Sequence, residues 1–247
     1  MRTYDAPIRE VCGDDQTINI AGTPSNYRAI RPGFRDVKLV CDTAWRLGLS
    51  PRLVHCLYYT VAGGYVADYA STATSTTASH FHIDAMAATS YLYLGVTMPV
   101  LGFCFDITDA NAEVTTLDME YCSTAQTLTA APTFTDVAGD SDQTDAAGAT
   151  LGVDGEYIFT YVDVVRSRLG TGNAPAYQNC YWYRFKPLAA LSATTSIANI
   201  IPIYKSATDL GYMSAAVEYN FNVDTTLIGG WYAQCSAEKH LYISWIR

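Results

Sequence analysis

Short apolar segments, bounded by turn-forming residues, recur along the whole chain. The segment VTTLDMEYC at 114–122 alternates in polarity with the period of a half-buried strand. Two apolar runs, 91–96 and 100–107, are separated by TMP, as expected for neighbouring buried strands. Helical periodicity is nearly absent. The pattern therefore predicts an all-β fold, a β-sandwich of jelly-roll type. Further strands are predicted at NYRAI, FRDVKLVC, AWRLGL, LVHCLYYT, EYIFTYVDVV, NCYWYRF, TTSIANIIPIY, MSAAVEYNFNV, TTLIGGWYAQC and HLYISWI.

Composition supports the same fold class. Charged residues make up 16 % of the chain, below the roughly 25 % of ordinary globular domains. The 19 tyrosines and many β-branched residues favour strands. A chain of 247 residues is long enough to bury a core without disulfides or structural metals.

The sequence predicts that the chain has two structural parts. Residues 1–52 are predicted to form an extended, basic N-terminal arm that docks on another subunit, because residues 1–26 are polar and rich in turn formers. Residues 53–247 are predicted to form the β-sandwich body. Within the body, 70–80 reads as a polar loop and 138–155 is the longest polar interruption.

The net charge of −9 is unevenly distributed. Residues 1–56 carry eight Lys/Arg and six Asp/Glu, whereas residues 57–247 carry seven and eighteen. An acidic body disfavours nucleic acid as a partner, because binding DNA or RNA needs a basic surface. The basic leading segment suggests docking on an acidic protein surface, including another copy's body, although a solvated pair of charged strands explains the same pattern.

The segment NCYWYRF at 179–185 would present two different faces as a strand. Tyr181, Tyr183 and Phe185 form the more uniformly apolar set and are predicted to face the core. Trp182 and Arg184 are then predicted to face another subunit, unless a neighbouring part of the same chain covers Trp182. The residues predicted to contact other subunits are Arg28, Arg31, Arg35, Trp45, Arg46, Trp182 and Arg184.

From about residue 91 to 204, the order of elements resembles a β-sandwich module of structural proteins of tailed bacteriophages. The matching features are the run from Tyr91 to Cys122, a polar loop, a Gly-rich turn, and YWYRFKPLAALSATTSI. Met119-Glu120-Tyr121 matches a "V-E-Y"-like step, and Leu191–Thr194 matches a Leu-Ser-Ala-Thr turn. The chain departs at Cys122, where such modules carry Trp, and under half of the chain is covered.

The resemblance implies a structural virion protein that catalyses nothing. It would decorate or cement the capsid exterior, contact the major capsid protein or other virion proteins, and form a homo-oligomer, expected to be a trimer. A tail or fibre component with a receptor- or carbohydrate-binding sandwich is the alternative, and a free carbohydrate-binding module or glycosidase is a third class. A lectin would be expected to use Trp182 or Trp231 for stacking.

Two motifs suggest metal ions without requiring them. His80, His82 and Asp84 would share one face of a strand, as zinc or iron ligands do. The aspartates of DVAGDSDQTD, at 136, 140, 142 and 145, suit calcium but lack the Gly and Glu of an EF-hand. Exposed histidines and a solvated hairpin explain both patterns equally well. We therefore expect no metal and no cofactor.

The remaining features concern location and cysteine chemistry. The opening MRTYDAPIRE has charged residues and proline where a secretory signal is apolar, so synthesis in the host cytoplasm is expected. The most apolar run, 91–105, is too short to span a bilayer, so no membrane association is expected. Seven cysteines without a C-x-x-C pair argue against a zinc ribbon and favour buried thiols. No G-x-S-x-G motif occurs, and no catalytic set is expected.

Overall fold

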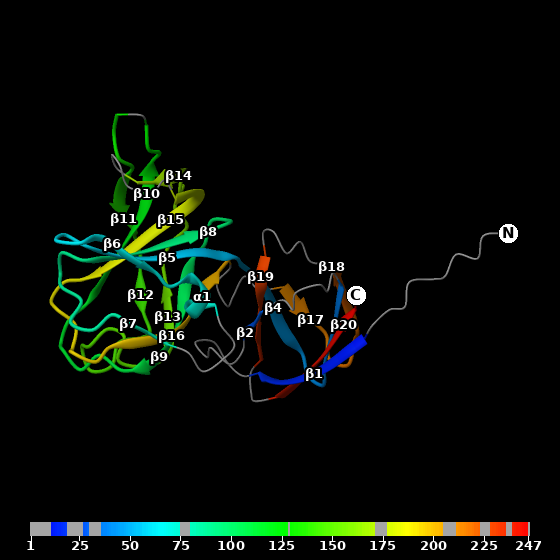
Figure 1. The fold of residues 1–247 in the computed structure, drawn as a ribbon. Coiled ribbons are helices and arrows are strands. Elements are labelled where there is room, and N and C mark those ends of the chain that lie inside the picture. Colours follow the sequence, from blue (N-terminus) through cyan, green and yellow to red (C-terminus); the bar gives the residue numbers. More distant parts are fainter. Residues whose placement is uncertain are drawn as a thin grey trace.

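The computed structural model describes residues 11–18, 27–29, 36–74, 80–127, 129–170, 177–204, 211–222, 228–235 and 239–246. Within these ranges the chain forms twenty strands and one short helix, α1 (Ala70–Ala73). The all-β prediction is therefore confirmed, while the jelly-roll connectivity stays a prediction. Figure 1 shows that the strands gather into two lobes.

The larger lobe is built from one continuous segment, residues 53–204, drawn from cyan to yellow in Figure 1. Its strands are β5 (Leu53–Thr60), β6 (Gly64–Asp68), β7 (Phe81–His82), β8 (Tyr91–Val96), β9 (Gly102–Asp109), β10 (Leu117–Thr124), β11 (Thr133–Asp136), β12 (Ser141–Asp142), β13 (Gly155–Ile158), β14 (Arg166–Leu169), β15 (Tyr177–Pro187) and β16 (Ser196–Ile203).

Two sheets make up the larger lobe. A seven-stranded sheet has the order β11-β10-β15-β8-β5-β6, with β14 also pairing with β15. A five-stranded sheet has the order β12-β13-β9-β16-β7. The core lies between them, where the rings of Phe103 and Phe105 in β9 meet those of Tyr183 and Phe185 in β15 edge to face. All four side chains are fully buried, which makes this contact the centre of the lobe.

The smaller lobe combines both ends of the described chain. Its strands are β1 (Val11–Ile18), β2 (Tyr27–Ala29), β3 (Asp36–Cys41), β4 (Trp45–Pro51), β17 (Gly211–Met213), β18 (Tyr219–Asn222), β19 (Ile228–Gln234) and β20 (Lys239–Ile246). They form two four-stranded sheets with the orders β1-β20-β3-β18 and β17-β4-β19-β2. Each strand pair in these sheets joins an N-terminal strand to a C-terminal one, with no exception among the described residues.

Strand alternation explains the core of the smaller lobe. In β3, Val37, Leu39 and Cys41 are buried, whereas the residues between them are half-buried. These side chains pack in one cluster with Trp45 of β4 and Trp231 of β19, each of which is 1 % exposed. Strands β3 and β4, which lie in the basic N-terminal part of the chain, therefore supply half of the apolar core of the smaller lobe.

This arrangement differs from the predicted arm over its described residues. Residues 36–51 are not an extended arm but two strands of a β-sandwich, and 11–18 is a strand paired with β20. Residues 1–10 and 19–26 lie outside the described residues. The expected boundary at 52 does fall between β4 and β5, but residues 211–246 belong with the N-terminal segment rather than with the body.

The two lobes meet at β4 and β16. The hydroxyl of Ser50, which is fully buried, donates to the carbonyl oxygen of Pro202 at 2.7 Å. A second apolar cluster of Cys104, Ile201 and Ile203 covers the face of the five-stranded sheet that points away from the core. Because β16 contacts β4, this face lies next to the junction of the lobes.

Candidate binding surface on the seven-stranded sheet

The strand β15 has two different faces, as its sequence predicted. Tyr183 and Phe185 point into the core. Because side chains alternate along a strand, Trp182 and Arg184 point to the opposite side of the seven-stranded sheet. We call that side the outer face, and it carries the candidate site.

Trp182 is not on the surface, contrary to the prediction that it contacts another subunit. Its side chain is 0 % exposed. It lies against Gly95, where an added Cβ would come within 2.8 Å of the indole ring. The ring of His55 stacks on it at 5.6 Å, and the indole nitrogen donates to the carbonyl oxygen of Ser167 at 2.8 Å. Neighbouring strands of the same chain thus cover Trp182, which was the alternative interpretation of the sequence.

Three tyrosines lie side by side across the outer face. Tyr65 of β6 is the cross-strand neighbour of Tyr59 in β5, which is in turn the neighbour of Tyr91 in β8. Successive ring centroids are 5.3 and 6.3 Å apart. All three residues are half-buried, so part of each stays accessible. We call Tyr65, Tyr59 and Tyr91 the tyrosine row.

Arg184 lies beside the tyrosine row, held between aromatic rings. Its guanidinium carbon is 4.1 Å from the ring centroid of Tyr91 and 4.3 Å from that of Phe134. The guanidinium also donates to Glu120 and, at 3.0 Å, to the hydroxyl of Tyr93. Burial opposes the charge of Arg184, yet Glu120 and Tyr93 raise its pKa on balance. Arg184 therefore stays charged and locked in position.

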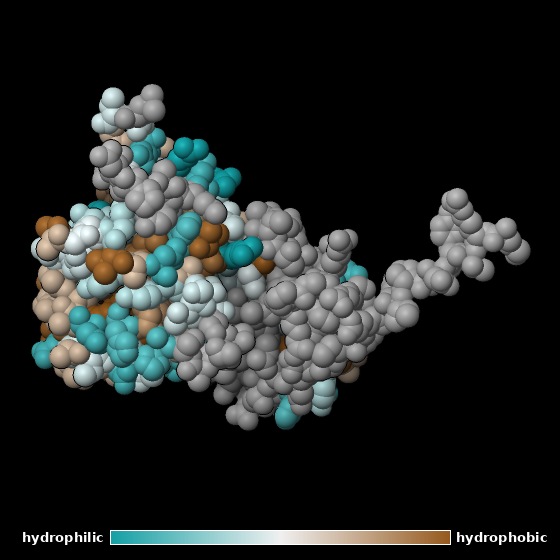
Figure 2. Space-filling view, in the orientation of Figure 1, coloured by the Kyte–Doolittle hydropathy of each residue, from teal (hydrophilic) through white to brown (hydrophobic). Residues whose placement is uncertain are grey.

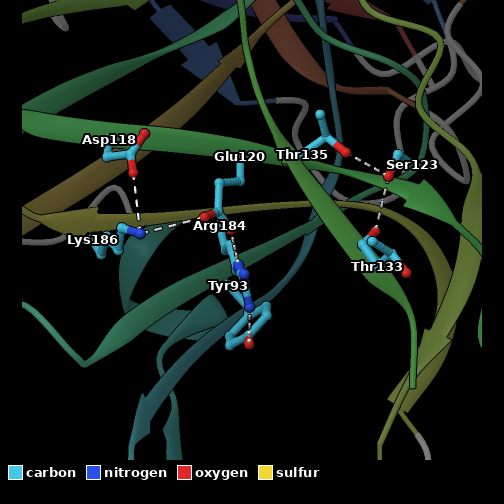
Figure 3. A network of polar contacts seen from close by, with 8 residues as sticks. All are labelled: Tyr93, Asp118, Glu120, Ser123, Thr133, Thr135, Arg184 and Lys186. Atoms are coloured by element: carbon cyan, nitrogen blue, oxygen red, sulfur yellow. Dashed lines mark hydrogen bonds and ion pairs between the residues drawn. The ribbon is translucent and has the colours of Figure 1, made fainter. Parts of the chain in front are cut away.

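Carboxylates continue the outer face toward its edge. Asp118, Glu120 and Asp136 place oxygen atoms within 4.8 Å of one another, and we call them the carboxylate trio. The ammonium of Lys186 lies 3.2 Å from Asp118 and 3.5 Å from Glu120. Figure 3 draws both ion pairs. Lys186 thus balances the charge of two members of the carboxylate trio. Asp136 is exposed, and no ion pair links it to any other described residue.

A polar contact also fixes the strand that carries Asp136. The hydroxyl of Thr135 donates to that of Ser123 at 2.8 Å, across the pair formed by β10 and β11 (Figure 3). Ser123 in turn donates to the carbonyl oxygen of Thr133 at 3.4 Å. The edge strand is therefore held in register beside Glu120.

The other predicted contact residues are dispersed. Trp45 is buried in the core of the smaller lobe, 1 % exposed, so it is not a surface residue. Arg46, its neighbour in β4, is exposed as alternation requires. Arg28 lies in β2 opposite Trp231, and its side chain is not described. Arg31 and Arg35 lie outside the described residues. Of the predicted contact residues with described side chains, Trp182 and Arg184 point to the outer face, and of these two only Arg184 is not fully buried.

The first possible metal motif, formed by His80, His82 and Asp84, lies at the surface. The His80 and His82 rings are 5.0 Å apart, and His82 is 3.4 Å from Asp84, with both partners of this pair largely exposed. Within the described ranges, these three residues do not bring one ligand atom each to within 4.8 Å of the others. The pattern is that of an exposed strand end.

The Asp-rich loop is organised by hydrogen bonds within the protein. Asp142 accepts from the amide of Thr144 at 2.8 Å and from the hydroxyls of Thr144 and Thr150, each at 2.6 Å. Asp145 accepts from the amide of Gly148, and Asp140 accepts from the hydroxyl of Tyr157. Burial and the neighbouring Asp140 raise the pKa of Tyr157. These contacts account for the loop's composition without an ion.

Six cysteines have described side chains, and each is a buried free thiol: Cys41, Cys56, Cys104, Cys122, Cys180 and Cys235. Burial raises the pKa of Cys180 to about 11 and that of Cys56 and Cys104 well above the usual value. Such thiols are poor nucleophiles at neutral pH. The prediction of buried thiols is confirmed for these six.

The tyrosine row was missed by sequence reasoning, although a signal was available. SYLYLGV places tyrosines at the alternate positions 91 and 93, and LVHCLYYT places two adjacent tyrosines, 58 and 59, near a strand end. Alternation along one strand shows only which residues of that strand lie on the same face of the sheet. It does not show that β5 lies between β6 and β8, which is what aligns the three rings.

No protein-family model, curated protein or solved structure matches this chain. Among the described residues, no helix has both the length and the apolar character needed to cross a membrane.

Proposed function

We propose that the protein is a non-catalytic structural component of a tailed-phage virion that decorates or cements the capsid exterior through subunit contacts. The resemblance to phage β-sandwich modules, at residues 91–204, falls entirely within the larger lobe. That lobe is also the one with the open outer face. The proposal therefore rests on a single part of the molecule.

The observation that carries the proposal is the composition of the outer face. Tyrosine and arginine dominate the energetics of protein interfaces, because they combine apolar area with hydrogen-bonding groups. Here the tyrosine row lies beside Arg184, whose position is fixed by Glu120 and two rings. A surface that is already ordered loses little side-chain entropy on binding. Figure 2 shows apolar residues scattered among polar ones on the visible side of the larger lobe.

The partners follow from chemistry and resemblance together. An acidic larger lobe disfavours nucleic acid, so the major capsid protein or another virion protein is the expected partner. A homo-oligomer, expected to be a trimer, would place several copies of the outer face on one particle and raise the effective affinity.

Electron microscopy of purified particles of the encoding phage tests the location, and particle binding tests the surface. Particles lacking the protein are incubated with the wild-type chain or with a Tyr59→Ser/Tyr91→Ser variant. The variant should bind at least about tenfold more weakly, as loss of interface anchors predicts. Tyr161→Ser, at a tyrosine that is 63 % exposed and outside the tyrosine row, is the matched control. Absence from the particle, or equal binding by both variants, would contradict the proposal.

A tail or fibre component that binds carbohydrate is the second candidate. Trp182 and Trp231 are 0 % and 1 % exposed, so neither is available for stacking on a sugar. The tyrosine row is the feature that favours this candidate, because tyrosine offers an apolar ring and a hydroxyl to a sugar. Glycan binding measured by calorimetry should then disappear in Tyr59→Ser/Tyr91→Ser and persist in Tyr161→Ser.

A further inference from the structure

The two lobes differ strongly in charge. Residues 53–204, the larger lobe, carry four Lys/Arg and fourteen Asp/Glu, a balance of −10. The remaining residues, which supply the smaller lobe, carry eleven and ten, a balance of +1. The net charge of the chain therefore belongs to the larger lobe, and like lobes of two copies repel while unlike lobes do not.

The smaller lobe also has a defined basic region. The segment from residue 28 to residue 52 carries six Lys/Arg and two Asp/Glu. Arg46 and Arg52 are exposed in the structure, in β4 and directly after it. Arg46 alternates with the buried Trp45 and Leu47, so its direction is fixed by the core beneath it.

On the larger lobe, the outer face offers a matching acidic position. Lys186 and Arg184 balance two members of the carboxylate trio, Asp118 and Glu120. Asp136 is the surplus charge at the edge of this face. It stands in the edge strand β11, beside Phe134 and the arginine that the rings hold. An exposed acid next to ordered aromatic and guanidinium groups is suited to a basic protein surface.

The chain's own basic segment is poorly placed for this contact. In the seven-stranded sheet, β10, β15 and β8 separate β11 from β5, the strand that follows β4. At about 4.8 Å between neighbouring strands, β11 and β5 are roughly 20 Å apart. Figure 1 likewise shows β11 and β4 in different parts of the molecule.

We infer that a second copy of this chain docks its basic β4 region, with Arg46 and Arg52, on the outer face of the larger lobe at Asp136. The contact is head to tail, so it uses two different surfaces of each copy. Such contacts close into a ring when the rotation between copies allows it. The contact uses the β11 edge of the outer face, and the tyrosine row on β6, β5 and β8 stays open to a particle protein. The charges set orientation and rate of association. The inference rests on the proposed function in one respect, because both treat the outer face of the seven-stranded sheet as a protein interface.

Sedimentation velocity of the full-length protein, without particles, tests this contact. The wild-type protein should self-associate at low salt and dissociate as salt is raised, because exposed charges are screened beyond about 10 Å at 0.1 M. Asp136→Arg should weaken association at least about tenfold. Glu113→Arg makes the same change of charge at another exposed acid of the larger lobe and should have little effect.

A charge swap provides the decisive comparison. Arg46→Glu/Arg52→Glu should also abolish self-association, whereas mixing it with Asp136→Arg should restore association between the two variants. Thermal melts establish that each variant is folded, and Asp136→Lys takes the place of Asp136→Arg in both experiments if Asp136→Arg is unstable. A monomeric wild-type protein at low salt, equal loss in Glu113→Arg, or no recovery on mixing would overturn the inference. Because particle occupancy is measured separately, failure here leaves the proposed function standing.

Discussion

The two lobes are both sandwiches of antiparallel strands, yet they are assembled in opposite ways. The larger lobe comes from one uninterrupted segment, and its core at Phe103 and Tyr183 is formed within that segment. The smaller lobe exists only where the two ends of the chain interleave, strand by strand. A contiguous segment can close its own core, whereas interleaved ends depend on contacts between residues far apart in sequence.

One ion pair from each lobe provides a second comparison. In the larger lobe, Arg184 and Glu120 are mostly buried, with side chains 19 % and 9 % exposed. In the smaller lobe, Lys38 and Glu218 form an ion pair at 2.8 Å with side chains 37 % and 50 % exposed. Removing one partner of a partly buried ion pair costs more than removing one partner of an exposed pair, because the remaining charge is left away from water without compensation. The larger lobe is therefore expected to be the more sensitive to loss of one charge.

The largest expected effect comes from the buried tryptophans. Trp182→Ala should cost about 3–5 kcal/mol and unfold the larger lobe, because it empties a fully enclosed position. Trp231→Ala should cost a similar amount, but only in the smaller lobe. Hydrogen exchange followed through thermal denaturation would separate the two. Tyr161→Ala, at an exposed ring, should change the free energy of unfolding by less than about 0.5 kcal/mol.

If each tryptophan variant instead loses protection in both lobes at once, the lobes form a single cooperative unit. The contrast between contiguous and interleaved assembly would then have no thermodynamic consequence.

A smaller effect is expected from the ion pairs. Arg184→Met should destabilise the protein by about 2–3 kcal/mol, because it leaves the partly buried Glu120 with only its longer contact to Lys186. Lys38→Met should cost no more than about 1 kcal/mol, since its pair is exposed. Urea denaturation of both variants gives the comparison. Equal losses would show that burial of the pair in the larger lobe does not strengthen it.

The smallest effect concerns acid. Burial opposes the charge of Asp68, but hydrogen bonds from His55 and from the amides of Cys56 and Ala70 lower its pKa on balance. A lowered pKa in the folded state gives stability that is present above about pH 4 and is lost as pH falls through the folded value. Asp68→Asn should therefore flatten the loss of stability below pH 4. Glu218, whose pKa is also lowered, lies at the surface, so only its contribution should vanish in high salt.

Sequence reasoning reached the strands but not their partners. Short apolar and aromatic runs bounded by turn-forming residues located β3, β5 and β15 to within two residues at each end. Nothing local shows that β3 pairs with β20 and β18. The basic segment was therefore interpreted as an arm, although Val37, Leu39 and Cys41 carry a strand pattern.

The candidate site was predicted in part for a similar reason. The sequence placed Arg184 on the face opposite Tyr183, which the structure bears out. It did not indicate that glycine at 95 leaves space for the indole of Trp182 to lie flat and become covered. The tyrosine row needed the order of three strands, and strand order depends on tertiary packing rather than on local pattern.

The interleaved smaller lobe has a consequence for synthesis. When Pro51 leaves the ribosome, the strand partners of β3 and β4 are still about 160 residues away. At about 5–20 residues per second, these strands wait on the order of ten to thirty seconds, while the larger lobe can already fold. Unpaired strand edges invite pairing with other chains, and positive charges discourage it. Lys38 and Arg46, alternating with apolar residues in these two strands, are therefore expected to discourage such pairing while the chain is still being synthesised.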